Sequence, residues 1–442
     1  MASPNIRPGF SAGDNAAVVI RQSYTRPLVI VTTLFFMWGF ITSLNDILVP
    51  HFKSIFELSY ARVMLIQFAF FSAYFWLSVP WSKVVNTIGY KRSMVAGLLT
   101  MAVGAFLFLP AASAASFPLF LGALIILAAG ITGLQVAANP YVVVLGKPEG
   151  ASSRLNLTQA FNSLGTTLAP KVGGLLILGS VPVAIEGVAS LSPQAQHLYR
   201  VQQAASVKLP YLMIGFALVL LAVMIAVSRL PKIETATCPP GEETTDTVWK
   251  HPNLLFGALG IFAYVGAEVS IGSFLVNYFG LPDIAGLSPR VAAGYVSYYW
   301  GGAMIGRFLG AAALRRIKTQ HLLALCTVCT TGLVTVSMLT SGHTAMWTIL
   351  AVGFFNSIMF PSIFSLGVAE LGCLTGSASG ILNMAIVGGA VLPLLQGTIA
   401  DRIGIHHAFF VPVVCYLYIL FYALHGSKPN SQRYLTALDS LS

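Results

Sequence analysis

Charged residues are scarce in this 442-residue chain: Asp, Glu, Lys and Arg together make up only 9% of it, whereas 56% is hydrophobic. A soluble globular domain carries about 25% charged residues and could not cover this much apolar surface. The scarcity therefore excludes an ordinary soluble fold and indicates that most of the chain faces lipid. The net charge of +10 does not indicate nucleic-acid binding, because the basic residues are scattered through short loops between apolar segments.

Cysteine is also scarce, and its five copies form no disulfide framework. Cys326 and Cys329 have C-x-x-C spacing but lie in an apolar segment without histidine partners, so we interpret them as packing residues. The first 25 residues lack the apolar core and cleavage site of a signal peptide. The sequence holds no nucleophile–base constellation, metal-ligand spacing or phosphate-binding loop, so we expect neither an enzyme nor a metal or cofactor.

What the sequence does contain is long apolar segments. A membrane-spanning helix needs about 20 mostly apolar residues. Twelve such windows occur, at roughly 26–50, 62–85, 91–110, 117–146, 154–180, 208–230, 252–280, 289–314, 319–341, 344–371, 376–399 and 407–427. We therefore predict an all-α membrane protein with twelve transmembrane helices.

The twelve windows fall into two halves. A polar segment at 231–251, with the stretch CPPGEETTDT, separates two six-helix bundles at 26–230 and 252–427, and polar tails occupy 1–25 and 428–442. Sliding the sequence by 221 positions aligns residues that break helices or allow close helix contacts. The aligned pairs are Gly39 with Gly260, Gly89 with Gly310, Pro140 with Pro361, Gly146 with Gly367, and Asn162 with Asn383. Two parallel six-helix pseudo-repeats predict the major facilitator fold, with a site near the midplane between the halves.

The loops predict an orientation in the bilayer. Lys and Arg are concentrated in the loops of one side, which the positive-inside rule assigns to the cytosol. We therefore expect both termini and the central loop to be cytosolic in a multi-pass protein of the inner (plasma) membrane. We expect it to be a monomer in the lipid bilayer.

Two acids lie well inside predicted spans: Asp46 in SLNDILVP and Glu268 in YVGAEVSIGSF. Such residues are costly in a membrane and usually face a polar partner or water. Burial favours the neutral form of a carboxyl group, so we predict that Asp46 takes up a coupling proton or another cation, with a structural role as the alternative. Glu268 is equally consistent with helix packing and with a place in the substrate site. Lys171 either reaches an interface or pairs with an acid.

Amide side chains also gather in the spans, and their donors and acceptors suit the hydroxyl groups of a sugar. Hydrogen bonding between helices is the alternative role. Aromatic side chains could cover a sugar ring, or simply pack in the core. The predicted substrate site comprises Trp38, Asn45, Gln135, Asn139, Gln159, Asn162, Glu268, Tyr298, Asn356 and Asn383. Tyr264, Tyr278, Tyr299, Trp300, Asn156 and Gln396 are further polar or aromatic candidates.

The stretches FFMWGFITSLNDILVPHFKSIFELS, GLQVAANPYVVVLG and SSRLNLTQAFNSLGTTLAP resemble the fucose–galactose–glucose permease family of the major facilitator superfamily, in its glucose/galactose transporter branch. The resemblance covers most of the chain, from the first span to the eleventh. It implies proton-linked, or in some relatives sodium-linked, uptake of a monosaccharide by alternating access. An uncoupled sugar facilitator remains an alternative, as do drug efflux and a receptor that merely binds sugar.

The same resemblance implies roles for individual residues. Asp46 matches an acid that follows an asparagine in span one, and Gln159 matches a glutamine that faces the sugar. Gln135 stands where the fucose branch has a glutamate, which favours glucose, galactose or mannose over fucose and leaves the coupling ion open. The stretch GRFLGAAALRR resembles a cytosolic loop of the superfamily, and we predict that its Arg307 is a gating residue that pairs with an acid or a helix end.

Overall fold

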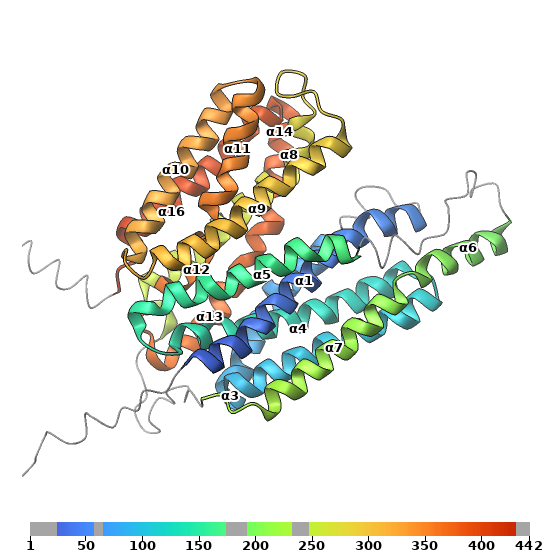
Figure 1. Ribbon diagram of the computed structural model, residues 1–442, viewed down its shortest axis with the longest axis horizontal. Coiled ribbons are helices and arrows are strands. Elements are labelled where there is room, and N and C mark those ends of the chain that lie inside the picture. The colour runs from blue at the N-terminus through green and yellow to red at the C-terminus, as the bar shows by residue number, and fades with distance from the viewer. Residues whose placement is uncertain (1–23, 57–64, 174–191, 232–246, 430–442) are drawn as a thin grey trace, which may run out of the picture.

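The computed structural model describes residues 24–56, 65–173, 192–231 and 247–429, and helices are the only regular elements in these segments. The first half comprises α1 (Thr25–Ile55), α3 (Leu65–Ser113), α4 (Phe117–Val144), η1 (Pro148–Gly150), α5 (Ala151–Gly173), α6 (Pro193–Ala205) and α7 (Lys208–Val227). Figure 1 shows these helices as one group.

The second half forms the other group of helices (Figure 1). It begins with η4 (Val248–Lys250), α8 (Pro252–Phe279), α9 (Pro289–Ala313), α10 (Thr319–Leu339), α11 (Gly342–Asn356) and α12 (Met359–Gly367). It continues with η5 (Gly372–Leu374), α13 (Thr375–Met384), η6 (Ala385–Val387), α14 (Gly388–Ile403), α15 (Ile405–Ala408), α16 (Phe410–Phe421) and η7 (Tyr422–Gly426).

These helices confirm the twelve predicted spans. The long α3 contains two of them, divided at Gly89, whose φ of 80° turns the chain out of the helix. Several later spans are broken into two pieces, such as α11 with α12 and α13 with α14. In the described segments nine helices are long and apolar enough to cross a membrane by length and composition alone. The more polar α5 and α9 fall short of that measure, and they contact each other between the halves.

Some boundaries and alignments differ from the prediction. The sixth span begins earlier than position 208, because α6 precedes α7 with only a short break. Gly89 and Gly310 are not equivalent, since Gly89 lies at the division of α3 and Gly310 lies inside α9. The predicted fifth span reached position 180, whereas the described part of α5 ends at Gly173.

Close approach of α1 to α5 depends on two glycines. A methyl group on Gly39 would lie 2.6 Å from the side-chain amide nitrogen of Asn162 and would collide with its backbone carbonyl oxygen. A methyl group on Gly165 would lie 2.9 Å from the backbone nitrogen of Phe40. The absence of side chains at these positions brings the backbones of α1 and α5 together, as small residues do in membrane helix pairs.

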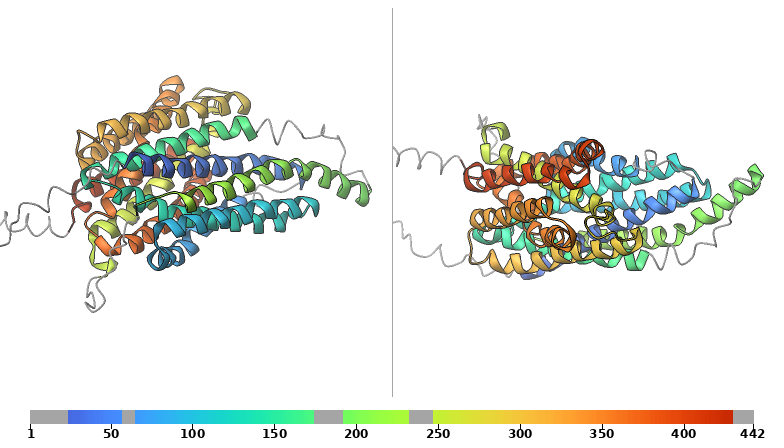
Figure 2. Two further views of the ribbon diagram at one scale, coloured as in Figure 1. Left: turned by 60° about the horizontal axis from the view of Figure 1, so that its bottom comes forward. Right: turned by 90° about the horizontal axis from the view of Figure 1, so that it is seen from above.

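The two halves are joined at one end of the molecule, which we call the closed end. Here α4 ends, α5 begins and α9 ends. The two groups of helices diverge away from α12 and α13 (Figure 1), and α6 extends beyond the other helices at the opposite end (Figure 2). Hydrogen bonds between the halves at this end join Asn86 to Ser377, Ser152 to Ser365, Ser153 to Ala311, Asn156 to Arg307, and Ser379 to Val136.

Candidate functional site between the two halves

Three prolines free backbone carbonyl groups for contacts between helices. A proline has no N–H, so the carbonyl four residues before it lacks its usual helical partner. Pro140 frees the carbonyl of Val136, which accepts a hydrogen bond from the Ser379 hydroxyl of the other half at 3.0 Å. Pro361, its partner in the pseudo-repeat, frees the carbonyl of Ser357.

The third proline acts within the first half. Pro170 frees the carbonyl of Thr166 on α5, which accepts a hydrogen bond from the Ser43 hydroxyl of α1 at 3.1 Å. The missing N–H groups of these prolines therefore leave backbone carbonyl groups available as acceptors at contacts between helices.

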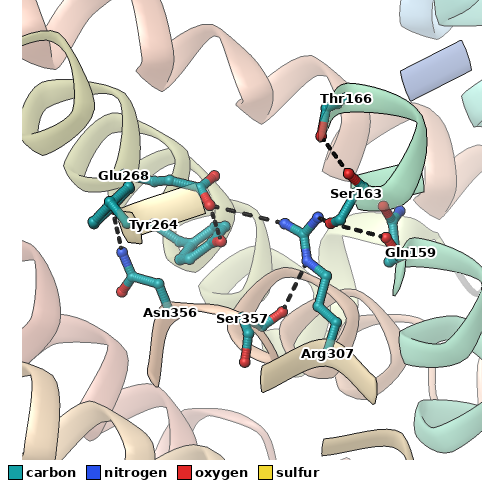
Figure 3. Close-up of polar contacts among 9 residues, drawn as sticks. Gln159, Ser163, Thr166, Tyr264, Glu268, Arg307, Asn356 and Ser357 are labelled. Atoms are coloured by element: carbon teal, nitrogen blue, oxygen red, sulfur yellow. Dashed lines mark hydrogen bonds and ion pairs between the residues drawn. The ribbon is translucent and has the colours of Figure 1, made fainter. Parts of the chain in front are cut away.

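Arg307 on α9 lies at the centre of a polar cluster between the halves (Figure 3). Its Nε donates to the freed carbonyl of Ser357 at 3.3 Å, and its Nη1 donates to the hydroxyl of Ser163 on α5, in the other half. Its Nη2 lies 3.8 Å from Oε1 of Glu268 on α8. The pairing predicted for Arg307 is therefore present, with Glu268 as the acid. We call Arg307 and these three partners the Arg307 bridge.

Glu268 lies in the second half and faces the first. Its Oε1 accepts a hydrogen bond from the Tyr264 hydroxyl at 2.7 Å, one helical turn earlier on α8. The side chains of Glu268 and Arg307 are each 13% exposed, so the ion pair is largely buried but still reachable by small molecules. Both roles considered for Glu268, helix packing and the substrate site, stay predictions.

In the first half, Gln135 and Asn139 lie one turn apart on α4, and both are buried. The Gln135 amide nitrogen donates to the Tyr74 hydroxyl of α3 at 2.6 Å. Neither polar atom of the Asn139 amide has a hydrogen-bond partner in the described part of the chain. Asn139 therefore retains hydrogen-bonding capacity close to the contact between Val136 and Ser379.

Gln159 and Asn162 share a face of α5, as their spacing predicted. Both are buried, but their amides differ. The Asn162 amide nitrogen donates to the carbonyl of Phe35 on α1 at 2.9 Å, so it helps to join these helices. The Gln159 amide nitrogen has no partner among the described residues, and the backbone carbonyl of Gln159 accepts from Ser163, which belongs to the Arg307 bridge.

The predicted amides of the second half are fully buried. Asn356 donates to the Tyr299 hydroxyl at 3.0 Å, and Asn383 donates to the carbonyl of Ser379 at 2.8 Å. The side-chain oxygen of each amide lacks a partner within the described segments. Both halves thus contribute buried amides with unused hydrogen-bonding capacity.

The predicted aromatic residues lie in different places. Trp38 is buried in α1 and packs against Phe35, with ring centroids 5.2 Å apart. Tyr298 does not join the polar cluster: its side chain is 61% exposed and packs against Trp347 at 6.0 Å. Its neighbour Tyr299 takes the inner position, since consecutive helical residues point about 100° apart. Tyr299, and not Tyr298, therefore contacts the buried Asn356, and the substrate role of Tyr298 stays a prediction.

Three predicted residues cannot be placed. The side chains of Asn45, Asp46 and Lys171 lie outside the described part of the structure, although their backbones belong to α1 and α5. The roles expected for Asn45 and Asp46 therefore stay predictions, as does the pairing considered for Lys171.

The sequence reasoning missed the small hydroxyl residues of the cluster. Ser163 and Ser379 make contacts between the halves, and Tyr74 holds Gln135. Serine is common in membrane helices for packing reasons, so its presence alone carries little signal. The free carbonyl of Ser357 could have been predicted from the sequence. Pro361 follows Ser357 by four residues and has no N–H to donate to that carbonyl.

Comparisons with known proteins agree with this architecture. The chain matches the Major Facilitator Superfamily over residues 30–392. It is 51% identical over 408 residues to the glucose/galactose transporter of Brucella abortus, a match that covers 92% of this chain and 96% of the relative. The crystal structure of the fucose–proton symporter FucP of Escherichia coli superposes with a TM-score of 0.83 at 31% identity, covering 92% of this chain and 100% of that chain.

A second crystal structure of FucP, in the outward conformation, superposes with a TM-score of 0.84 at 32% identity and the same coverage of both chains. The overall fold of this chain is thus shared with a solved transporter. The chain therefore belongs to the major facilitator superfamily, and within it to the family that includes the glucose/galactose transporters and the fucose–proton symporter.

Proposed function

We propose that this transporter takes up a hexose of the glucose and galactose type together with a proton, by alternating access. It is a membrane transporter and not an enzyme. Its 51% identity to a glucose/galactose transporter supports the sugar, and its similarity to a fucose–proton symporter supports the coupling ion. Sodium coupling is the alternative for the ion, and uncoupled diffusion of sugar is the alternative for the mechanism.

The observation that carries this proposal is the set of buried amides with unused hydrogen-bonding capacity in both halves. Asn139 and Gln159 belong to the first half, and Asn356 and Asn383 belong to the second. A buried polar group without a partner is costly, and a ligand rich in hydroxyl groups would satisfy donors and acceptors together. A hexose between the halves would therefore be bound by both, as alternating access requires.

The proposed site contains Gln135, Asn139, Gln159, Asn162, Asn356, Asn383 and Glu268, with Trp38 and Asn45 from α1. We propose that Asp46, on the same helix, takes up the coupling proton. With both termini in the cytosol of an inner-membrane monomer, the closed end lies on the cytosolic side. The described conformation is then open toward the outside.

The test is transport in proteoliposomes with labelled glucose and galactose. Accumulation against a concentration gradient, abolished by a protonophore and unchanged by removal of sodium, is expected for proton symport. Loss of accumulation on removal of sodium would identify the sodium alternative. Uptake that only equilibrates the sugar would identify the uncoupled facilitator.

A matched pair of variants tests the site. Gln159→Ala is expected to raise the apparent sugar dissociation constant about tenfold, because an unpaired hydrogen-bonding group costs roughly 1–3 kcal/mol. Gln194→Ala removes an exposed glutamine on α6 and should leave binding unchanged. Normal sugar affinity in Gln159→Ala would refute the placement of the site.

A further inference from the structure

We propose that Glu268 is a second protonation site of the transport cycle, and that a proton on Glu268 breaks the Arg307 bridge and opens the closed end. The inference rests on the proposed function, because it assigns a step in proton-coupled transport. It concerns the second half of the molecule, whereas Asp46 belongs to the first.

The geometry of Arg307 is the first reason. Its guanidinium group contacts Ser163 on α5, the Ser357 carbonyl beside α11 and the Glu268 carboxylate on α8 (Figure 3). Arg307 is thus fixed by the second half on two sides while it donates to the first half on the third. Any change in its position alters a contact between the halves.

Backbone carbonyl groups near Arg307 add further hydrogen bonds between α9 and α5. The carbonyl of Arg307 accepts a hydrogen bond from the Asn156 side chain of α5 at 2.6 Å. One turn further along α9, the carbonyl of Ala311 accepts from Ser153 at 2.6 Å. The segment of α9 that carries Arg307 therefore holds α5 through side-chain and backbone groups together.

The second reason is the charge balance. Glu268 is the acid that balances the Arg307 charge in the described part of the structure, and both side chains are mostly buried. Proton uptake at Glu268 would leave a buried guanidinium group without an anionic partner, which is strongly unfavourable. Rotation of Arg307 toward water would hydrate this unpaired charge. The rotation would also break the hydrogen bond from Arg307 to Ser163, which is one of the contacts that join the two halves at the closed end.

The other titratable groups near Glu268 do not replace its charge. Those that interact with it electrostatically are Tyr264 on the same helix, Arg307 and Tyr299 on α9, and Tyr416 on α16. The sequences of α12, α13 and η6, which also pack against α8, contain no titratable residue. On α14, Asp401 and Arg402 lie in the last turn. The remaining elements that contact α8 carry His406 and His407 on α15, Tyr422 and His425 on η7, His343 on α11 and Lys250 on η4. Glu268 is therefore the carboxyl group within ion-pair distance of Arg307 in the described part of the chain.

The effect moves a proton from the open side toward the closed end. In the described conformation the closed end is joined while Glu268 and Arg307 lie within ion-pair distance. A proton that arrives from the open side neutralises Glu268 and releases the bridge, and the closed end then opens. The proton leaves Glu268 for solvent on that newly opened side, and the restored carboxylate pairs with Arg307 again.

The test measures the closed end directly, without sugar. Cysteines introduced at Asn86 and Ser377, whose side chains hydrogen-bond at 3.0 Å across the halves, report closure through disulfide formation or spin-label distance in a background lacking the native cysteines. Between about pH 9 and pH 5 the closed fraction is expected to fall as carboxyl groups take up protons. Glu268→Gln mimics the protonated acid and should lower the closed-to-open ratio about tenfold at high pH, removing its pH dependence.

Three further variants separate Glu268 from other causes. Glu268→Asp restores a titratable group and should restore the pH dependence. Tyr264→Phe removes the hydrogen bond to Glu268 but keeps the carboxylate, so it should shift the midpoint and keep the transition. Asp46→Asn should keep the transition as well.

The proposal is overturned if Glu268→Gln keeps the wild-type pH dependence, or if Asp46→Asn alone abolishes it. Because closure is measured without sugar, a failure here is distinguishable from a failure of the proposed transport function, which the proteoliposome assay reports. In that assay Glu268→Gln is expected to lose accumulation and to retain exchange of labelled for unlabelled sugar.

Discussion

Replacing Gly39 with alanine tests the contact between α1 and α5. The added methyl group would lie 2.6 Å from the Asn162 amide nitrogen, whereas ordinary contacts begin near 3.4 Å. The two helices must therefore separate locally by at least about 0.8 Å, because the Asn162 backbone carbonyl oxygen lies closer still. This separation stretches the 2.9 Å hydrogen bond from Asn162 to the Phe35 carbonyl beyond a useful length.

The expected loss in the free energy of unfolding is the sum of three contributions. Overpacking costs roughly 1–3 kcal/mol, and the lost hydrogen bond adds about 1 kcal/mol. The better helix propensity of alanine returns up to about 1 kcal/mol, which leaves a net destabilisation of about 2 kcal/mol. The displacement also moves α1, which carries Asp46, relative to Gln159, so sugar affinity should fall.

Thermal unfolding in detergent and sugar binding by calorimetry measure both effects. The matched control is Gly122→Ala on α4, where an added methyl group meets no atom within 4 Å. This control should be as stable as the wild type or slightly more stable, with unchanged sugar affinity. If Gly39→Ala unfolds at the wild-type temperature and binds sugar normally, the close approach of α1 to α5 is not what positions the site.

Three further predictions concern coupling, the sugar site and the closed end. Asp46→Asn should abolish sugar accumulation and spare exchange in proteoliposomes, and retained accumulation would exclude Asp46 as the coupling group. Tyr74→Phe leaves the Gln135 amide unpaired, so the sugar dissociation constant measured by calorimetry should change several-fold, by roughly 1 kcal/mol. Ser379→Ala removes the donor to the Val136 carbonyl and should lower stability by about 1 kcal/mol in thermal unfolding; no loss would mean that this contact contributes nothing.

The helices could be predicted from the sequence because the membrane imposes a length and an apolar composition on each span. The hydropathy that identifies a span is lowest in the helices that carry polar residues of the candidate site. The helices α5 and α9 fall below the hydropathy of ordinary spans, yet the windows at 154–180 and 289–314 were still apolar enough to predict them. Pro361 indicates the break between α11 and α12, whereas the break between α13 and α14 lies in a stretch without proline and depends on tertiary contacts.

The sequence predicted which types of residue form the candidate site. It did not predict which of these residues would contact one another. An isolated acid and an arginine in neighbouring spans indicated Glu268 and Arg307, but not that they would meet. Tyr298 and Tyr299 have the same side chain, and only the rotation of α9 decides which one faces inward. A one-residue difference in helical phase lies beyond what a sequence of nearly uniform apolarity can specify.

The broken helix at Pro361 has a consequence for engineering this transporter. Replacing Pro361 with alanine would supply the missing N–H and repair the hydrogen bond to the Ser357 carbonyl, a change usually chosen to make a helix more robust. Here the repaired helix would compete with Arg307 for the same oxygen. A more stable helix would therefore weaken the contact that Arg307 makes with the Ser357 carbonyl. Mutations that are meant to stabilise this protein should leave its internal prolines unchanged.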